Sequence, residues 1–161
     1  MWIFTKRNKK YCSFEKKTKQ NENFDAAAQK EFLKGAKIAY ETIITDFSDN
    51  DNKLIASKPL LSKKIYDEFN KALIERGQRG HFAEITFIGI NSADIKEHKK
   101  VDKVLKVTVD FVSEIITCIR DKEKNIVSGN PDKIKTIYDT WTFSRDIKSN
   151  NPNWLLIETL T

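Results

Sequence analysis

Side chains able to carry acid–base or nucleophilic chemistry are sparse in this chain of 161 residues. His81 and His98 are the only histidines, and both are predicted in loops that flank the first strand. A histidine can serve as a general base, but neither stands in a recognisable nucleophile or metal arrangement, so we interpret both as solvated loop residues. Cys12 and Cys118 have no metal-ligand spacing, which favours a reducing compartment with Cys118 as a packing residue. The sequence therefore predicts no enzyme, no metal and no cofactor.

Asp139 is the acidic residue with the most unusual predicted position. It lies in phase with Trp141 and Phe143 on the face of a strand that should be buried. Burial would raise the pKa of its carboxyl and make it a pocket carboxylate, whereas a place at a pocket mouth would pair it with a lysine or arginine. The Arg145–Asp146 pair is interpreted as an ion pair at the end of the strand, with a ligand contact as the alternative. The residues alone leave these alternatives open.

Aromatic side chains recur on the predicted core faces of the helices and strands. Such a set is typical of a packed core, but part of it can line an apolar cavity that admits an acyl chain or a peptide side chain. The expected cavity-lining residues are Tyr40, Phe87, Phe111, Asp139, Trp141, Phe143 and Trp154.

The formal net charge of +6 is concentrated at the start of the chain. Residues 1–20 hold seven lysines and arginines against one acidic residue, which leaves 22 basic and 22 acidic residues in 21–161. A nucleic-acid-binding domain usually carries its excess charge on the folded surface, so nucleic acid is not a favoured partner. Residues 8–23 are too polar to order themselves by burial. We predict a basic, disordered tail over residues 1–23 and a folded domain over 24–161.

The hydrophobic pattern of the domain changes once along the chain. A period of three to four residues predicts a helix from Phe24 to Phe47 and a second helix after the N-cap Ser62, ending near Gly77. Alternation then predicts strands over 83–87, 105–119 with a bulge at 112–114, 137–144 and 154–159, with a loop at 129–132. Helices followed by meandering strands predict an α+β fold, with two N-terminal helices packed on a bent, mainly antiparallel four-stranded sheet.

Four segments resemble the Tim44-like domain family, which comprises the C-terminal domain of the mitochondrial inner-membrane import-motor subunit and its alphaproteobacterial relatives. They are Phe32–Glu41 (FLKGAKIAYE), Pro59–Ser62 (PLLS), Asp139–Asp146 (DTWTFSRD) and Asn151–Trp154 (NPNW). The last two are the specific part, because a chance match to both at this spacing is rare. The likeness covers about residues 24–161.

The resemblance implies a cystatin-like cone of the nuclear-transport-factor-two type, with no known reaction. It also implies a peripheral position on the cytoplasmic or matrix face of an inner membrane, and binding to cardiolipin-rich lipid. The family pattern places a membrane helix and a polar linker ahead of the domain, whereas this chain begins with a basic tail. Two explanations of this difference remain: the chain is the detached half of an anchored protein, or it is a form that relies on surface charge. The chaperone-binding region of the family lies ahead of this domain, so chaperone tethering does not carry over.

The favoured hypothesis is a non-catalytic module that binds an anionic phospholipid surface and acts with components of protein translocation or membrane-protein biogenesis. Each basic residue near an anionic leaflet adds about 1 kcal/mol. The expected lipid-binding residues are Lys6, Arg7, Lys9 and Lys10 in the tail and Lys30, Lys34 and Lys37 in the first helix, the latter beside Ala27, Phe32 and Leu33. The alternatives are a small-molecule binder or enzyme that uses the cone cavity, and a protein that contacts the ribosome or RNA.

Overall fold

Two helices begin at side-chain caps. The computed structural model describes residues 24–48, 53–151 and 153–160. In α1 (Ala26–Asp46), the carboxylate of Asp25 accepts a hydrogen bond from the backbone N–H of Ala28 at 2.9 Å. In α2 (Lys63–Gln78), Ser62 caps the backbone N–H of Ile65 at 3.3 Å, as predicted. A short 3₁₀ helix, η2 (Lys58–Leu60), precedes α2. These caps satisfy donors that a helix start otherwise leaves unpaired.

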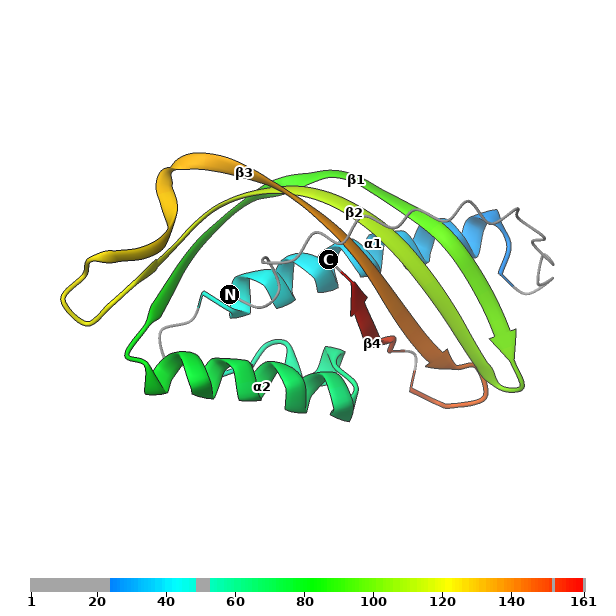
Figure 1. Cartoon of the computed structure of the whole chain (residues 1–161). Helices are drawn as coiled ribbons and strands as arrows, with labels where there is room; N and C mark the ends of the chain where they lie inside the picture. The colour runs from blue at the N-terminus through cyan, green and yellow to red at the C-terminus, as the bar shows by residue number, and fades with distance from the viewer. Residues whose placement is uncertain (1–23, 49–52, 152, 161) are drawn as a thin grey trace.

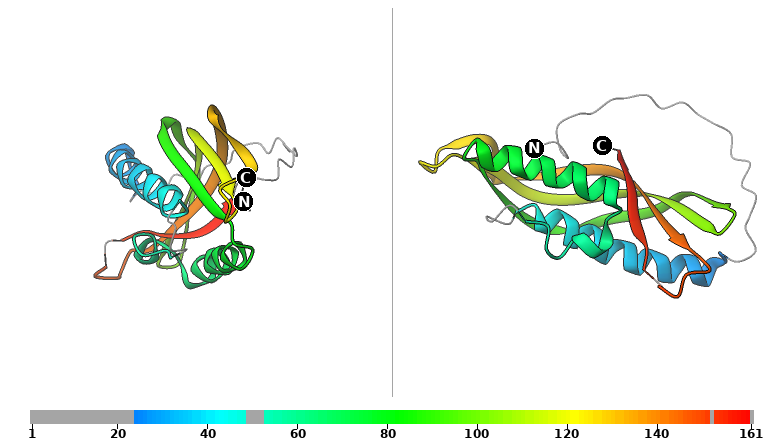
Figure 2. Two further views of the ribbon diagram at one scale, coloured as in Figure 1. Left: turned by 90° about the vertical axis from the view of Figure 1, so that its left-hand side faces the viewer. Right: turned by 90° about the horizontal axis from the view of Figure 1, so that it is seen from below.

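Four strands form one antiparallel sheet in the order β1-β2-β3-β4. They are β1 (Phe82–Val101), β2 (Val104–Arg120), β3 (Ile126–Asp146) and β4 (Leu155–Leu160). The sheet curves over the helices, and both helices lie on its concave side (Figures 1 and 2). The predicted α+β fold, with two helices on a bent four-stranded sheet, is confirmed.

The strands are longer and less regular than the alternation predicted. His98 lies inside β1 and its ring packs edge-on against Phe24, so its prediction as a loop residue was wrong. The predicted bulge at 112–114 of β2 lies on the partner strand instead, where Ile88 and Asn91 fall between paired residues. The predicted loop at 129–132 is part of β3. Gly129 to Asp132 have the residue types of a turn, yet they lie in a strand. A strand can hold a bulge and still pair with its neighbour on both sides of it.

The hydrophobic core fills the space between the helices and the concave face of the sheet. Its helical part comes from the stripe of α1 around Phe32 and Tyr40 and from the stripe of α2 around Phe69. Its strand part comes from alternate residues of β2 and β3, which places Val107, Val109, Phe111, Ile115, Ile137, Trp141 and Phe143 in contact with the helices. Burial of these stripes supplies the main free energy of folding, at roughly 25 cal/mol per Å² of apolar surface.

The two helices are tied to each other and to the last strand by polar contacts. The buried guanidinium of Arg76 in α2 donates to the carbonyl of Phe47 at the end of α1 at 2.7 Å. A cation is favourable there, because the last carbonyls of a helix carry partial negative charge. On the other side, the N–H of Ser62 donates to the carbonyl of Leu156 in β4 at 2.9 Å. The start of α2 is therefore fixed to the sheet, and its end to α1.

Replacement of Arg76 by Met should lower the free energy of unfolding by about 1.5–3 kcal/mol, because the charge-assisted bond to the Phe47 carbonyl is lost while most of the stem packing remains. Urea unfolding would measure the change. Arg79→Met, an exposed residue at the end of the same helix, is the matched control. A loss for Arg76→Met no larger than that of the control would contradict the assigned role.

Candidate functional site

A polar cluster lies inside the core, where α1 crosses the sheet. The hydroxyl of Tyr40 donates to Oδ2 of Asp139 on β3 at 2.6 Å, and it lies 2.8 Å from Oγ of Ser113 on β2. Tyr40 and Ser113 are fully buried and Asp139 is 2% exposed. Helical spacing brings Tyr40 onto the core face of α1, and strand alternation turns Asp139 and Ser113 inward. Three elements thus meet at one hydrogen-bonded centre.

Aromatic rings surround this cluster. Tyr40 stacks on Phe111, with ring centroids 4.3 Å apart and planes at 18°, and it also contacts Trp141 at 4.6 Å and Phe87 at 6.2 Å. Phe32 continues the layer toward the other end of α1, where it meets both Phe143 and Trp154. The structure therefore brings all seven expected cavity residues into one layer between α1 and the sheet; Phe87 and Trp154 are only partly buried. That they line a cavity remains a prediction.

Burial dominates the electrostatics of the cluster. It raises the pKa of Asp139 from 3.8 to about 7, although the hydrogen bond from Tyr40 opposes the shift by stabilising the charged carboxylate. Burial, and then the charge of Asp139, also raise the pKa of the Tyr40 phenol. Two buried polar atoms of this layer have no hydrogen-bond partner among the described residues, namely Oδ1 of Asp139 and Nε1 of Trp141. Such atoms are uncommon in a core, where most polar groups are paired.

Ser113 is the member of the cluster that the sequence analysis missed. Its signal was present, because Ser113 stands between Phe111 and Ile115 at the spacing of one strand face. The predicted bulge at 112–114 concealed it, since a bulge breaks the alternation on which the face assignment depends.

The other side chains that could take part in chemistry lie outside the polar cluster. Cys118 is buried on β2 and donates to Glu84 at 3.2 Å, and burial, followed by that contact, raises the pKa of its thiol. Arg145 and Asp146 form no ion pair within the described residues, and Asp146 instead accepts from the N–H of Lys148. Over the described ranges, no group of three or more histidine, cysteine and acidic residues could hold a metal ion.

The lysines expected to contact lipid lie on the outer face of α1. Lys30, Lys34 and Lys37 are exposed, and Lys34 pairs with Glu31 at 2.7 Å. Phe32 is buried and Leu33 is partly buried against the core, so neither accompanies these lysines on the outer face. The tail residues Lys6, Arg7, Lys9 and Lys10 fall outside the described residues. In the part of the chain that the structure describes, no helix is long and apolar enough to span a bilayer.

A surface groove of about 610 Å³ runs along the second half of α1. Its lining includes Ile38, Thr42, Thr45 and Ala56, and none of the expected cavity residues. This groove is therefore separate from the aromatic layer.

Substitution of Asp139 by Asn should remove a pH dependence from the stability of the fold. Because burial raises the pKa of Asp139 to about 7, wild-type stability should fall as pH rises from about 4 to 8, by on the order of 4 kcal/mol over the full window. Asparagine stays neutral and still offers an oxygen to Tyr40. Urea unfolding at low and high pH should therefore find Asp139→Asn more stable than wild type at pH 8 and closer to it at pH 5. Parallel pH profiles for the two proteins would refute this.

Substitution of Tyr40 by Phe should leave Asp139 without its donor and the Ser113 hydroxyl without its acceptor, at a loss of about 1–3 kcal/mol in unfolding free energy. The loss should be larger at pH 8 than at pH 5, because the hydroxyl stabilises the charged carboxylate. Tyr66→Phe, a partly buried tyrosine of α2, is the control. Equal losses of unfolding free energy at both pH values would mean that the Tyr40 hydroxyl does not stabilise the charged carboxylate of Asp139.

Comparisons with known proteins agree with the fold and with the motifs. A family profile described as the Tim44-like domain matches residues 14–161. A curated Caenorhabditis elegans protein named "Probable mitochondrial import inner membrane translocase subunit tin-44" is 26% identical over 90 residues, which are 53% of this chain and 21% of that protein. The chain thus matches about one fifth of that relative's length.

Among solved structures, the "Crystal structure of intermembrane space region of chloroplast protein ARC6" has a TM-score of 0.56 at 13% identity, covering 80% of this chain and 94% of that one. At that identity the likeness concerns the fold alone. The family match covers nearly the whole chain and contains the motifs over 32–41, 59–62, 139–146 and 151–154. This chain belongs to the Tim44-like domain family.

Proposed function

We propose that this protein is a non-catalytic module that binds the surface of an inner membrane and acts with components of protein translocation or membrane-protein biogenesis. The observation that carries the proposal is the Tim44-like match over residues 14–161. The name of the Caenorhabditis elegans relative, a subunit of a mitochondrial import inner membrane translocase, points the same way. The proposed location is the cytoplasmic or matrix face of that membrane.

The arrangement of the interior supports a binding role over catalysis. The only carboxylate of the central polar cluster, Asp139, is covered by aromatic rings and bonded to Tyr40. The cysteine and both histidines of the described residues lie outside this cluster. A nucleophile and a general base must reach both each other and a substrate. Cys118 contacts the carboxylate of Glu84, but its thiol is buried.

Charge is the proposed basis of membrane contact. Lys30, Lys34 and Lys37 lie on one outer stripe of α1, and the basic residues of the tail precede that helix in sequence. Phosphate-rich lipids such as cardiolipin would attract both sets, and the attraction should weaken as salt screens it. The balance of charge over residues 21–161 argues against RNA as the main ligand.

A small-molecule binder is the second candidate, and one observation favours it. Oδ1 of Asp139 can accept a hydrogen bond and Nε1 of Trp141 can donate one, yet both are buried without a partner among the described residues. A ligand hydroxyl group has both the donor and the acceptor that these two atoms lack.

Flotation with vesicles tests the membrane proposal. Wild type should float with cardiolipin-containing vesicles at low salt and less at high salt, and replacement of Lys30, Lys34 and Lys37 by Gln should reduce the bound fraction by roughly tenfold, on the order of 1 kcal/mol per removed charge at most. The matched control replaces Lys63, Lys64 and Lys71 of α2, which are also exposed. Absence of wild-type flotation at low salt would sink the proposal. Competition with RNA in the same assay would reveal a preference for nucleic acid.

A further inference from the structure

The half of β3 nearest the β2–β3 turn is exposed on both faces. From Ile126 to Thr136 no residue is buried, and Pro131 alone is partly covered. Three aliphatic side chains stand in this stretch with about half or more of their surface in water: Ile126 (50%), Val127 (48%) and Ile134 (58%). We call residues 120–136 the β2–β3 arm; it projects from one end of the sheet (Figure 1). Three exposed aliphatic side chains on one short strand segment make it a candidate contact surface.

The ladder of the arm is irregular around Ile134. Asn130 pairs with Thr117 and Lys135 pairs with Ile115, so residues 131–134 oppose Ile116 alone and bulge out of the sheet. β4 pairs with β3 only from Thr140 to Ser144. The outer edge of β3 along the arm is therefore unpaired within the described residues.

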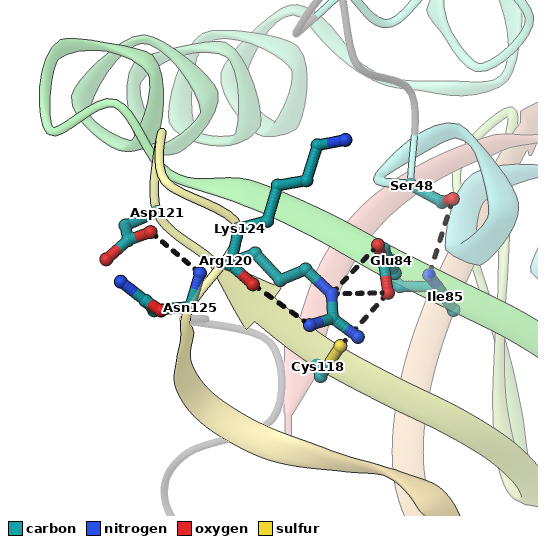
Figure 3. Close-up of polar contacts among 8 residues, drawn as sticks. All are labelled: Ser48, Glu84, Ile85, Cys118, Arg120, Asp121, Lys124 and Asn125. Atoms are coloured by element: carbon teal, nitrogen blue, oxygen red, sulfur yellow. Dashed lines mark hydrogen bonds and ion pairs between the residues drawn. The ribbon is translucent and has the colours of Figure 1, made fainter.

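The turn of the arm is held in place from its base (Figure 3). The carboxylate of Asp121 accepts the backbone N–H groups of Glu123 and Asn125, each at 2.9 Å. Arg120 is bound by Glu84 of β1 at 3.0 Å and donates to the carbonyl of Lys124 at 3.1 Å. The side chains of the arm are thus presented by a structured turn, so a partner would not have to order it first.

Cations flank the apolar side chains. The arm carries lysines at 122, 124, 133 and 135, against acidic residues at 121, 123 and 132. Arg120 and the four lysines outnumber the three acidic residues, so the arm has a net positive charge. Aliphatic side chains bordered by lysines suit the boundary between lipid headgroups and acyl chains, where the lysine stems can extend toward phosphate.

The geometry disfavours an extended peptide as the occupant. Strand addition needs a continuous row of backbone donors and acceptors, and the bulge at 131–134 interrupts that row. Pro131 lies in the bulge and has no N–H to offer. A lipid surface needs no backbone pairing, so the features that block a peptide do not block it.

We propose that the β2–β3 arm inserts Ile126, Val127 and Ile134 into the interface of an anionic bilayer while its lysines contact lipid phosphate. This inference rests on the proposed membrane function and names a contact that function does not require, because the lysines of α1 and the tail would bind through charge alone. The arm supplies the apolar part of the binding, which salt does not screen.

The test replaces Ile126, Val127 and Ile134 together by Ser and measures partition onto vesicles of phosphatidylcholine and cardiolipin at low and high salt. The arm variant should bind about tenfold more weakly than wild type at every salt concentration, since burial of aliphatic surface does not depend on ionic strength. The matched control replaces Ile55, Val101 and Leu160, which are exposed by 68%, 46% and 58% and lie away from the arm. The control should bind as wild type does, and unchanged urea midpoints would show that all three proteins are folded.

The outcomes separate the two proposals. If wild type does not bind the vesicles, the membrane function fails and this inference fails with it. If wild type binds and the arm variant binds equally well, the inference alone is overturned. If the arm variant loses binding only at low salt, its effect is electrostatic and the proposed insertion is wrong.

Discussion

The structure depends on the burial of Tyr40 between α1 and the concave face of the sheet. Its ring stacks on Phe111 of β2, and its hydroxyl bonds to Asp139 of β3 and approaches Ser113 of β2. A buried carboxylate costs free energy unless it is hydrogen-bonded or neutral, so α1 has to keep its position over both strands. That requirement fixes the helix against the sheet more narrowly than apolar packing would, because a hydrogen bond has a direction and a short range.

The rest of the fold accommodates this constraint. α2 is attached at both ends, through Arg76 to the end of α1 and through Ser62 to Leu156 in β4. Next to the polar cluster, the irregularities of the first two strands lie on β1, at the edge of the sheet, and the pairs between β2 and β3 are kept there. The central strands therefore pair without interruption across the polar cluster, from Val104 to Ile115 of β2.

The residues proposed for membrane contact lie on the surface. Two surfaces stand out, and they differ in their physics. The outer stripe of α1 carries Lys30, Lys34 and Lys37, beside the exposed side chain of Ile38. The β2–β3 arm combines aliphatic side chains with lysines on a structured turn. Electrostatic attraction by the lysines of α1 acts at a distance and is weakened by salt, so it would bring the protein to the membrane. Insertion of the arm acts only on contact and is not weakened by salt, so it would keep the protein there.

The sequence by itself determined what local periodicity and capping control. It predicted both helices, the cap at Ser62, the α+β class, the four strands in their order and the family, because amphipathic stripes and short motifs are encoded by neighbouring residues. It also placed Asp139 on a buried face. The tertiary structure alone decided that its partner is Tyr40, 99 residues away, and that His98 and residues 129–132 lie within strands. These features depend on which strands pair and where the ladder slips, and such long-range contacts leave no signal in the local pattern.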